Sequence, residues 1–176
     1  FHSLDDTGRV MYVGSFSKII APGMRLGYLV APPEVLDRAR AIKSGSGVNQ
    51  FAALAVHRYA TTQLDGHIVE INDVQRAKRD AMLAALGESL GPAARWSRPD
   101  GGLFIWLQMP GSADLVDAQQ PAMEADVGYH PGPLFSPDGT SGRNYARLCY
   151  GYNTPEEIRE GIARLAQVFE REGFLA

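Results

Sequence analysis

One short run of the sequence, Gly14 to Tyr28 (GSFSKIIAPGMRLGY), combines a lysine with hydroxyl and cationic neighbours. Lys18 follows Ser15 and Ser17, and Arg25 comes seven positions later. An amine that attacks a carbonyl must be neutral and fixed in place, and a nearby cation with partial burial lowers its pKa. Serine hydroxyls, turn amides and a planar guanidinium suit a phosphate group. The run therefore predicts a Schiff-base lysine beside a phosphate site, the combination that pyridoxal phosphate requires.

This run resembles the lysine motif of the fold-type I aminotransferases of class I and II. Within that family it is most similar to the 2-aminoadipate, kynurenine and aromatic aminotransferases. The resemblance implies pyridoxal 5'-phosphate as the cofactor and Lys18 as the Schiff-base lysine and proton shuttle. It also implies that Ser15, Ser17 and Arg25 hold the cofactor phosphate. Each of these residues alone would be an ordinary surface residue, so the spacing of the whole run carries the resemblance.

Lys18 lies near the start of this chain, whereas the resembled family places its lysine past the middle of a much longer chain. The resemblance thus covers the chain as the C-terminal half of a family member. The preceding half is expected to supply an aspartate at the pyridine nitrogen, an aromatic residue stacked on the ring, and an asparagine and a tyrosine at the phenolic oxygen. The residues from Phe1 onward predict neither a signal nor a transit peptide and resemble a chain entered midway.

Arg147, in the run Asn144 to Tyr150 (NYARLCY), is the candidate substrate-binding residue. A guanidinium binds a carboxylate through two parallel hydrogen bonds, which fix its orientation. The resemblance places such an arginine on a strand, where it holds the substrate α-carboxylate. The alternative is a structural ion pair with a nearby acid, because an unpaired buried charge is costly. Arg143 is expected at the surface.

Two glycines, a histidine and an asparagine each allow a structural or a functional interpretation. The segment Arg98 to Trp106 (RPDGGLFIW) resembles a family segment, and Gly101 and Gly102 either form a turn or allow close approach to the substrate. His130 is expected to pack near the substrate entrance. Asn49 is expected to cap a helix, although the resemblance also allows it to approach the active site of a partner subunit.

The composition suits one globular domain or parts of two, with 176 residues, 45% hydrophobic residues and a net charge of -3. Seventeen scattered Lys and Arg residues against 20 acids predict no nucleic-acid partner. Cys149 is the single cysteine, which favours a cytoplasmic setting, and its spacing from the histidines predicts no metal site. No apolar run approaches the roughly 18 to 20 residues that cross a bilayer.

Apolar periodicity and turn residues predict an α/β fold. The predicted strands are 10–14, 24–30, 94–96, 103–107, 127–130 and 145–150. The first two are expected to be antiparallel because no crossover helix separates them. The predicted helices are one opened by Pro32-Pro33 and ended at 45–47, one from Gln50 to about 61, one from Asp65 to about 90, one at 114–125 broken by Pro121, and one opened by a capping box at Thr154 and Glu157.

These elements and the resemblance predict two domains. Residues 1–66 are expected to be the end of the large cofactor-binding domain, whose sheet is mostly parallel with one antiparallel strand. Residues 67–176 are expected to form the small α+β C-terminal domain, including the long helix that links the two domains.

The favoured function is transfer of an amino group between an amino acid and a 2-oxo acid by a homodimeric enzyme. One alternative is the aminotransferase-like domain of a GntR-type (MocR-like) transcription regulator, which uses the cofactor to sense a metabolite. Another is an enzyme of the same fold that catalyses β-elimination or decarboxylation. The lysine motif is common to all three, so it does not separate them.

Overall fold

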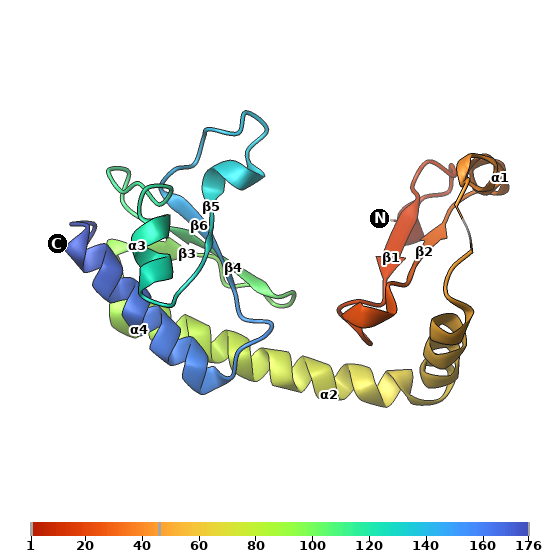
Figure 1. Cartoon of the computed structure of the whole chain (residues 1–176), viewed down its shortest axis with the longest axis horizontal. Coiled ribbons are helices and arrows are strands. Elements are labelled where there is room, and N and C mark those ends of the chain that lie inside the picture. Colours follow the sequence, from red (N-terminus) through yellow and green to blue (C-terminus); the bar gives the residue numbers. More distant parts are fainter. Residues whose placement is uncertain (1, 46, 176) are drawn as a thin grey trace. The chain divides into compact units, whose positions relative to one another are not determined.

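The computed structural model describes residues 2–45 and 47–175. The chain divides into two compact units, Phe1–Ile71 and Asn72–Ala176. The first unit contains a β-hairpin and helix α1, and the second contains a four-stranded sheet, shown in green to blue in Figure 1. Helix α2 (Gln50–Leu90) belongs to both units, and the boundary predicted near residue 66 lies within it.

Strands β1 (Tyr12–Ser15) and β2 (Gly27–Val30) form an antiparallel two-stranded sheet, which confirms the predicted pairing. The ring of Tyr28 lies over Gly14, where an added Cβ would come within 2.1 Å of the Tyr28 Cζ. A Cβ on Gly27 would lie 2.8 Å from the Gly14 carbonyl oxygen. The two glycines therefore allow close pairing at the end of the hairpin that carries the lysine turn.

Helix α1 (Pro33–Ile42) starts at the second proline, as predicted, because the first turn of a helix needs no amide hydrogen bonds. Helix α2 starts after Asn49, whose side-chain oxygen accepts a hydrogen bond from the Ala52 N–H at 3.1 Å. This is the predicted cap. The prediction of two separate helices after Asn49 was wrong, since Gln50–Leu90 is a single helix.

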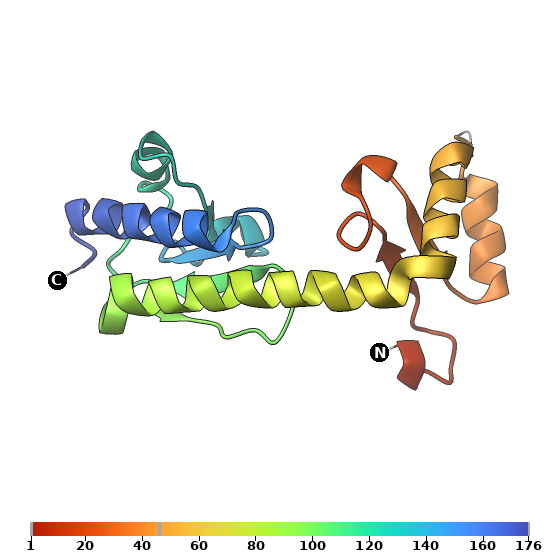
Figure 2. The same cartoon turned by 90° about the horizontal axis from the view of Figure 1, so that it is seen from below.

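Helix α2 bends near residues 61–65, where the sequence predicted a break between two helices. Figures 1 and 2 both show the helix changing direction in its gold-to-yellow part, within the first unit. Thr61 Oγ1 donates to the His57 carbonyl at 2.9 Å, and Thr62 Oγ1 donates to the Arg58 carbonyl at 2.8 Å. Such bonds from side chain to preceding carbonyl bend helices, and Gly66 adds local freedom. The polar stretch therefore bends the helix without ending it.

The second unit is built on an antiparallel sheet with the order β3-β4-β6-β5. Its strands are β3 (Arg95–Trp96), β4 (Phe104–Gln108), β5 (His130–Pro131) and β6 (Tyr145–Cys149). All strand pairs among the described residues are antiparallel. The parallel strands expected for the large-domain sheet are therefore not among residues 2–45 and 47–175.

One face of this sheet packs against the end of α2 and against α4 (Pro155–Arg171). Alternate residues of a strand point to opposite faces, so Ile105 and Leu107 are buried while Trp106 faces away from the core. Helix α4 buries the apolar face that the sequence predicted, with no residue more than 4% exposed: Ile158, Ile162, Leu165, Val168 and Phe169.

The remaining elements are short. Helix α3 (Gln119–Glu124) occupies only the end of the predicted helix 114–125, and it tolerates Pro121 in its first turn, where the amide would have no helical partner. Three 3-10 helices are present: η1 (His2–Leu4), η2 (Pro22–Met24) and η3 (Gly91–Ala93). A fourth, η4 (Gly132–Phe135), lies between the predicted strands 127–130 and 145–150.

Replacing Thr154 tests the predicted capping box at the start of α4. Thr154 Oγ1 accepts from the Glu157 N–H at 3.2 Å, and Glu157 Oε2 accepts from the Thr154 N–H at 2.7 Å. Thr154→Ala should lower the free energy of unfolding by about 1 kcal/mol in urea denaturation, because a helix amide loses its partner. Thr140→Ala is the control, since the Thr140 hydroxyl has no hydrogen bond to any residue the structure describes. Equal effects of the two substitutions would contradict the capping role.

Candidate functional site

The connection between β1 and β2 holds Lys18 in a tight turn. The carbonyl of Phe16 accepts hydrogen bonds from the amides of residues 19–21 at 2.8 to 3.3 Å. The Phe16 N–H donates to the Leu26 carbonyl at 3.1 Å, which closes the connection at its base. These bonds fold the segment around Lys18 into one helical turn. The backbone of the lysine is therefore fixed on both sides.

Apolar residues anchor this turn on the first turns of α2. Leu26 is buried with Ala52 and Val56 in a small core, and partly buried residues pack around it: Phe16, Ile20, Met24 and Ala53. Lys18 falls between Phe16 and Ile20 in sequence and is exposed. The partial burial expected for Lys18 is thus not supplied by the described residues of its own unit.

Arg25 follows the 3-10 helix η2 and has a left-handed backbone, with φ of 52° and ψ of 39°. Its N–H and its Nη1 both donate to the Pro22 carbonyl, at 3.3 and 3.0 Å. A left-handed conformation costs a non-glycine residue about 1 to 2 kcal/mol, and such strain is concentrated at functional sites. Because the turn extends through Arg25, β2 starts at Gly27, later than the predicted strand.

The side chains predicted to hold a phosphate, Ser15, Ser17, Lys18 and Arg25, all belong to this one connection or its edge. Ser15 Oγ accepts from the Ser17 N–H at 3.2 Å, which leaves the Ser15 hydroxyl hydrogen able to donate. The run 14–28 contains two cations and no acidic residue. Neither cation pairs with a carboxylate among the described residues. This set of donors fits a phosphate dianion.

Arg147 lies on β6 with its guanidinium between two aromatic rings. Its Cζ is 4.1 Å from the ring centroid of Phe104 and 4.5 Å from that of Phe135. Its Nε is buried without a hydrogen-bond partner, and no acid within residues 2–45 and 47–175 forms an ion pair with it. The alternative of a structural ion pair therefore has no partner here. A buried donor left unpaired is costly, so its retention points to an anionic ligand.

More aromatic rings surround this arginine on the open face of the sheet. Trp106 meets Phe135 edge-on at 5.5 Å and stacks on Tyr145 at 5.7 Å. His130 lies opposite Arg147 on β5 and meets the Phe135 ring edge-on at 6.5 Å, in a packing contact. Rings that displace water strengthen the field of the guanidinium at short range.

Gly132 determines where Phe135 can lie. A Cβ at Gly132 would lie 2.1 Å from the Gly142 carbonyl oxygen and 3.0 Å from the Tyr145 Cβ, so η4 can approach β6 only with glycine at this position. The local sequence His130-Pro131-Gly132 contains no sign of the contact with Gly142. That contact joins two ends of a loop.

Several residues discussed above have structural roles. Arg143 is half-exposed and donates from Nε to Asp114 at 2.6 Å and from Nη2 to Asp117 at 3.2 Å. Burial would raise the pKa of Asp114, but hydrogen bonds from Arg143 and the backbone hold that pKa below its usual value. Gly102 has φ of 86°, and its carbonyl accepts from the Tyr150 hydroxyl at 2.8 Å, which supports a turn.

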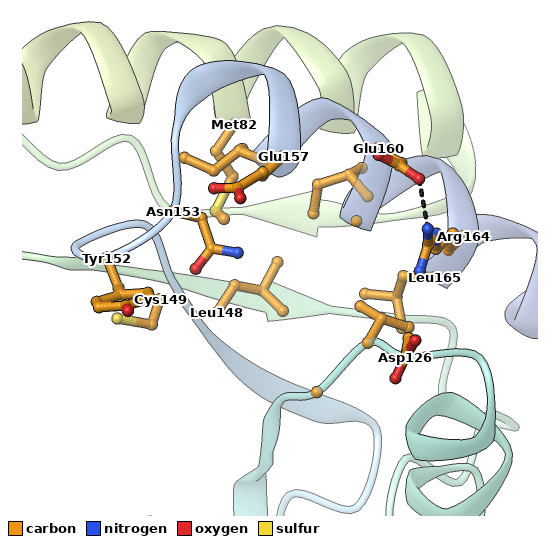
Figure 3. Close-up of a pocket in the computed structure, with 15 residues that line it drawn as sticks. Met82, Asp126, Leu148, Cys149, Tyr152, Asn153, Glu157, Glu160, Arg164 and Leu165 are labelled. Atoms are coloured by element: carbon orange, nitrogen blue, oxygen red, sulfur yellow. Dashed lines mark hydrogen bonds and ion pairs between the residues drawn. The ribbon is translucent and has the colours of Figure 1, made fainter.

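A cavity of about 530 Å³ opens elsewhere on the second unit, between α4, the end of β6 and the turn 126–128 (Figure 3). Two of its acidic groups already have partners, since Glu157 belongs to the capping box and Glu160 pairs with Arg164. None of the five predicted site residues lines it. The cavity is therefore separate from the candidate site.

Three further findings concern the described part of the chain. It contains no group of three or more His, Cys, Asp and Glu residues that could hold a metal ion. No helix in it has the length and apolar character required to cross a membrane. Cys149 is a free, exposed cysteine.

A lysine-bearing hairpin, an antiparallel sheet bearing an arginine and a long helix common to both define the C-terminal part of a fold-type I α/β protein. The model of the family "Aminotransferase class I and II" matches residues 2–165. The chain belongs to this family, which confirms the family predicted from the lysine motif.

Two known proteins illustrate the enzyme branch of the family. The chain is 36% identical over 171 residues to aromatic-amino-acid aminotransferase 1 of Thermococcus litoralis, covering 96% of this chain and 41% of that protein. The crystal structure of Pyrococcus horikoshii kynurenine aminotransferase in complex with PMP superposes with a TM-score of 0.89 at 36% identity, covering 97% of this chain and 43% of that one. The chain thus spans about two fifths of the length of these relatives.

A third known protein is a regulator. HTH-type transcriptional regulator TauR of Rhodobacter capsulatus is 34% identical, with 94% of this chain and 34% of the regulator covered. The similarity therefore extends to both classes of protein that the lysine motif suggested.

Gly132→Ala tests the placement of the aromatic rings around Arg147. The added methyl should displace η4 and lower the free energy of unfolding by about 1 to 3 kcal/mol, the usual effect of overpacking. Because Phe135 contacts Trp106, tryptophan emission should shift to the red. Gly111→Ala is the matched control, since its Cβ would meet nothing within 4 Å. Unchanged emission and stability in Gly132→Ala would contradict the contact.

Proposed function

We propose that this chain is part of a pyridoxal-phosphate-dependent aminotransferase, which moves an amino group between an amino acid and a 2-oxo acid. The observation that carries the proposal is the lysine turn, where Lys18 is exposed on a fixed backbone in the same connection as Arg25, and neither cation pairs with an acid among the described residues. Membership of the aminotransferase family supports it. The PMP complex of the kynurenine aminotransferase supports the cofactor.

The lysine turn would bind the cofactor in two ways. Ser15, Ser17 and Arg25 hold its phosphate, and Lys18 Nζ is the point of covalent attachment. When bound, pyridoxal phosphate supplies an electron sink that makes the Cα–H bond of an amino acid acidic. Lys18 carries the proton away from Cα and returns it as a general base and acid. A rigid turn with a long flexible side chain suits this work, since the amine moves while its Cα stays in place.

Arg147 would bind the substrate through its α-carboxylate. An amino acid and its 2-oxo acid share this carboxylate next to the reacting carbon, so one arginine serves both halves of the reaction. The guanidinium fork fixes the orientation of the carboxylate. The rings of Phe104 and Phe135 restrict the guanidinium and keep it dry, so the carboxylate gains more from binding than it would in water.

We also propose that the protein is a cytoplasmic homodimer. The family resemblance supports a homodimer, and small-molecule substrates without nucleic acid or membrane partners fit the scattered charges. The single cysteine favours a cytoplasmic protein.

The second candidate is the effector-sensing domain of a transcription regulator, and the 34% identity to TauR supports it. An assay on the full-length protein separates the two. Incubation with amino acids and 2-oxoglutarate should yield glutamate if the protein is an aminotransferase. Absence of glutamate, together with a DNA-binding module upstream of Phe1, would favour the regulator.

Lys18→Ala should abolish covalent attachment of the cofactor. In the full-length protein the visible absorbance of bound cofactor should disappear, and borohydride reduction should leave no cofactor mass on the lysine turn. Lys43→Ala removes another exposed lysine and should retain both signals. A band that persists in Lys18→Ala would refute the assignment of Lys18.

Arg147→Ala should weaken substrate binding by about 2 to 5 kcal/mol, because a desolvated carboxylate loses its charged partner. The measurement is the dissociation constant of an unreactive amino acid analogue for the full-length protein. Arg159→Ala, which removes a mostly exposed arginine on α4, is the control and should bind normally. Unchanged affinity in Arg147→Ala would rule out the carboxylate role.

A further inference from the structure

A hydrogen bond also connects the lysine turn to α2, and it has no part in the chemistry proposed above. His67 Nε2 lies 2.8 Å from the carbonyl oxygen of Ile19, the residue next to Lys18. The two residues are 48 positions apart in sequence. The amides of residues 19–21 bond within the turn to Phe16, whereas the Ile19 carbonyl takes its partner from α2. A carbonyl at the end of a single helical turn has no partner within the turn, and His67 supplies one here.

The His67 ring is itself held in place by Tyr59. The two rings meet edge to face, with centroids 5.3 Å apart and an angle of 83° between planes. A carbonyl oxygen only accepts, so Nε2 must carry the hydrogen. Both the neutral ring with hydrogen on Nε2 and the charged ring meet this condition. The observed geometry therefore allows this hydrogen bond in either form of the ring.

The bend in α2 brings these two rings together. In a straight helix, residues eight positions apart are separated by about 12 Å along the axis. Tyr59 and His67 are eight positions apart, yet their ring centroids lie at 5.3 Å. The bonds from Thr61 and Thr62 to preceding carbonyls lie between them in the sequence. The bend thus places His67 where it can reach the lysine turn.

We propose that His67, oriented by Tyr59 across the bend of α2, is a positioning residue that fixes the turn carrying Lys18. Apolar packing on Ala52 and Val56 holds the turn against α2 but does not fix its orientation. The hydrogen bond to the Ile19 carbonyl is directional and fixes that orientation. The catalytic consequence rests on the proposed function of Lys18, but the tie itself does not. A looser turn leaves Lys18 Nζ less often in place for proton transfer, which lowers kcat and leaves substrate binding at Arg147 unchanged.

The first test is hydrogen–deuterium exchange of the full-length protein without substrate, read by mass spectrometry. His67→Ala should raise exchange in residues 16–24 by about 2- to 10-fold, the effect of one ordinary hydrogen bond, with β6 and α4 unchanged. His67→Gln should restore protection, because its amide nitrogen can replace Nε2. His57→Ala is the control, since that side chain is exposed and has no hydrogen bond, ion pair or ring contact among the described residues.

The second test is kinetic and uses the same variants. His67→Ala should lower kcat with KM nearly constant, and His67→Gln should recover most of kcat. If His67→Ala unfolds, Thr61→Ala/Thr62→Ala carries the test, because a straighter helix should raise exchange in residues 16–24 in the same way. Unchanged exchange in that segment in the folded variants would overturn the proposal. A wild-type protein without bound cofactor would contradict the proposed function alone, because the exchange result does not require the cofactor.

Discussion

Packing of the β1–β2 connection on the first turns of α2 is the constraint on which the lysine site depends. Leu26, Ala52 and Val56 make a small core, and Phe16 and Ile20 pack against it on either side of Lys18 in sequence. Apolar burial is not directional, so it does not by itself fix the backbone conformation. The hydrogen bonds to the Phe16 carbonyl fold this buried segment into a defined turn. The outcome is a fixed backbone beneath the exposed side chain of Lys18, the arrangement on which the proposed role of this lysine rests.

The second unit holds its arginine by different means. Arg147 has a buried Nε without a hydrogen-bond partner and two aromatic rings over its guanidinium. Burial of a positive charge is unfavourable unless an anionic group pairs with it. The opposite face of the same sheet, with Ile105 and Leu107, supplies the burial that stabilises the unit. Two-residue alternation along the strands thus places the buried core residues on one face of the sheet and Arg147 with its aromatic neighbours on the other.

Helix α2 contributes buried apolar residues to the cores of both units. Ala52 and Val56 face the lysine turn near its start, whereas Leu86 and Leu90 are buried in the core of the second unit near its end. The sequence predicted two helices here, one ending near residue 61 and the next starting at Asp65, but the structure has a single helix. The hydroxyls of Thr61 and Thr62 bond to preceding carbonyls, which bends the helix without ending it.

Local sequence signals determined much of this protein: the lysine motif and its family, the antiparallel hairpin, the Asn49 cap, the capping box at Thr154 and the apolar face of α4. Each depends on residues a few positions apart, whose geometry is set by backbone bonding. Only the tertiary structure decided which groups meet across the chain: His67 with Ile19, Gly132 with Gly142, and Arg147 with Phe104 and Phe135. These contacts depend on how separate elements pack, and packing is decided by the fit of whole surfaces, which no short segment of sequence contains.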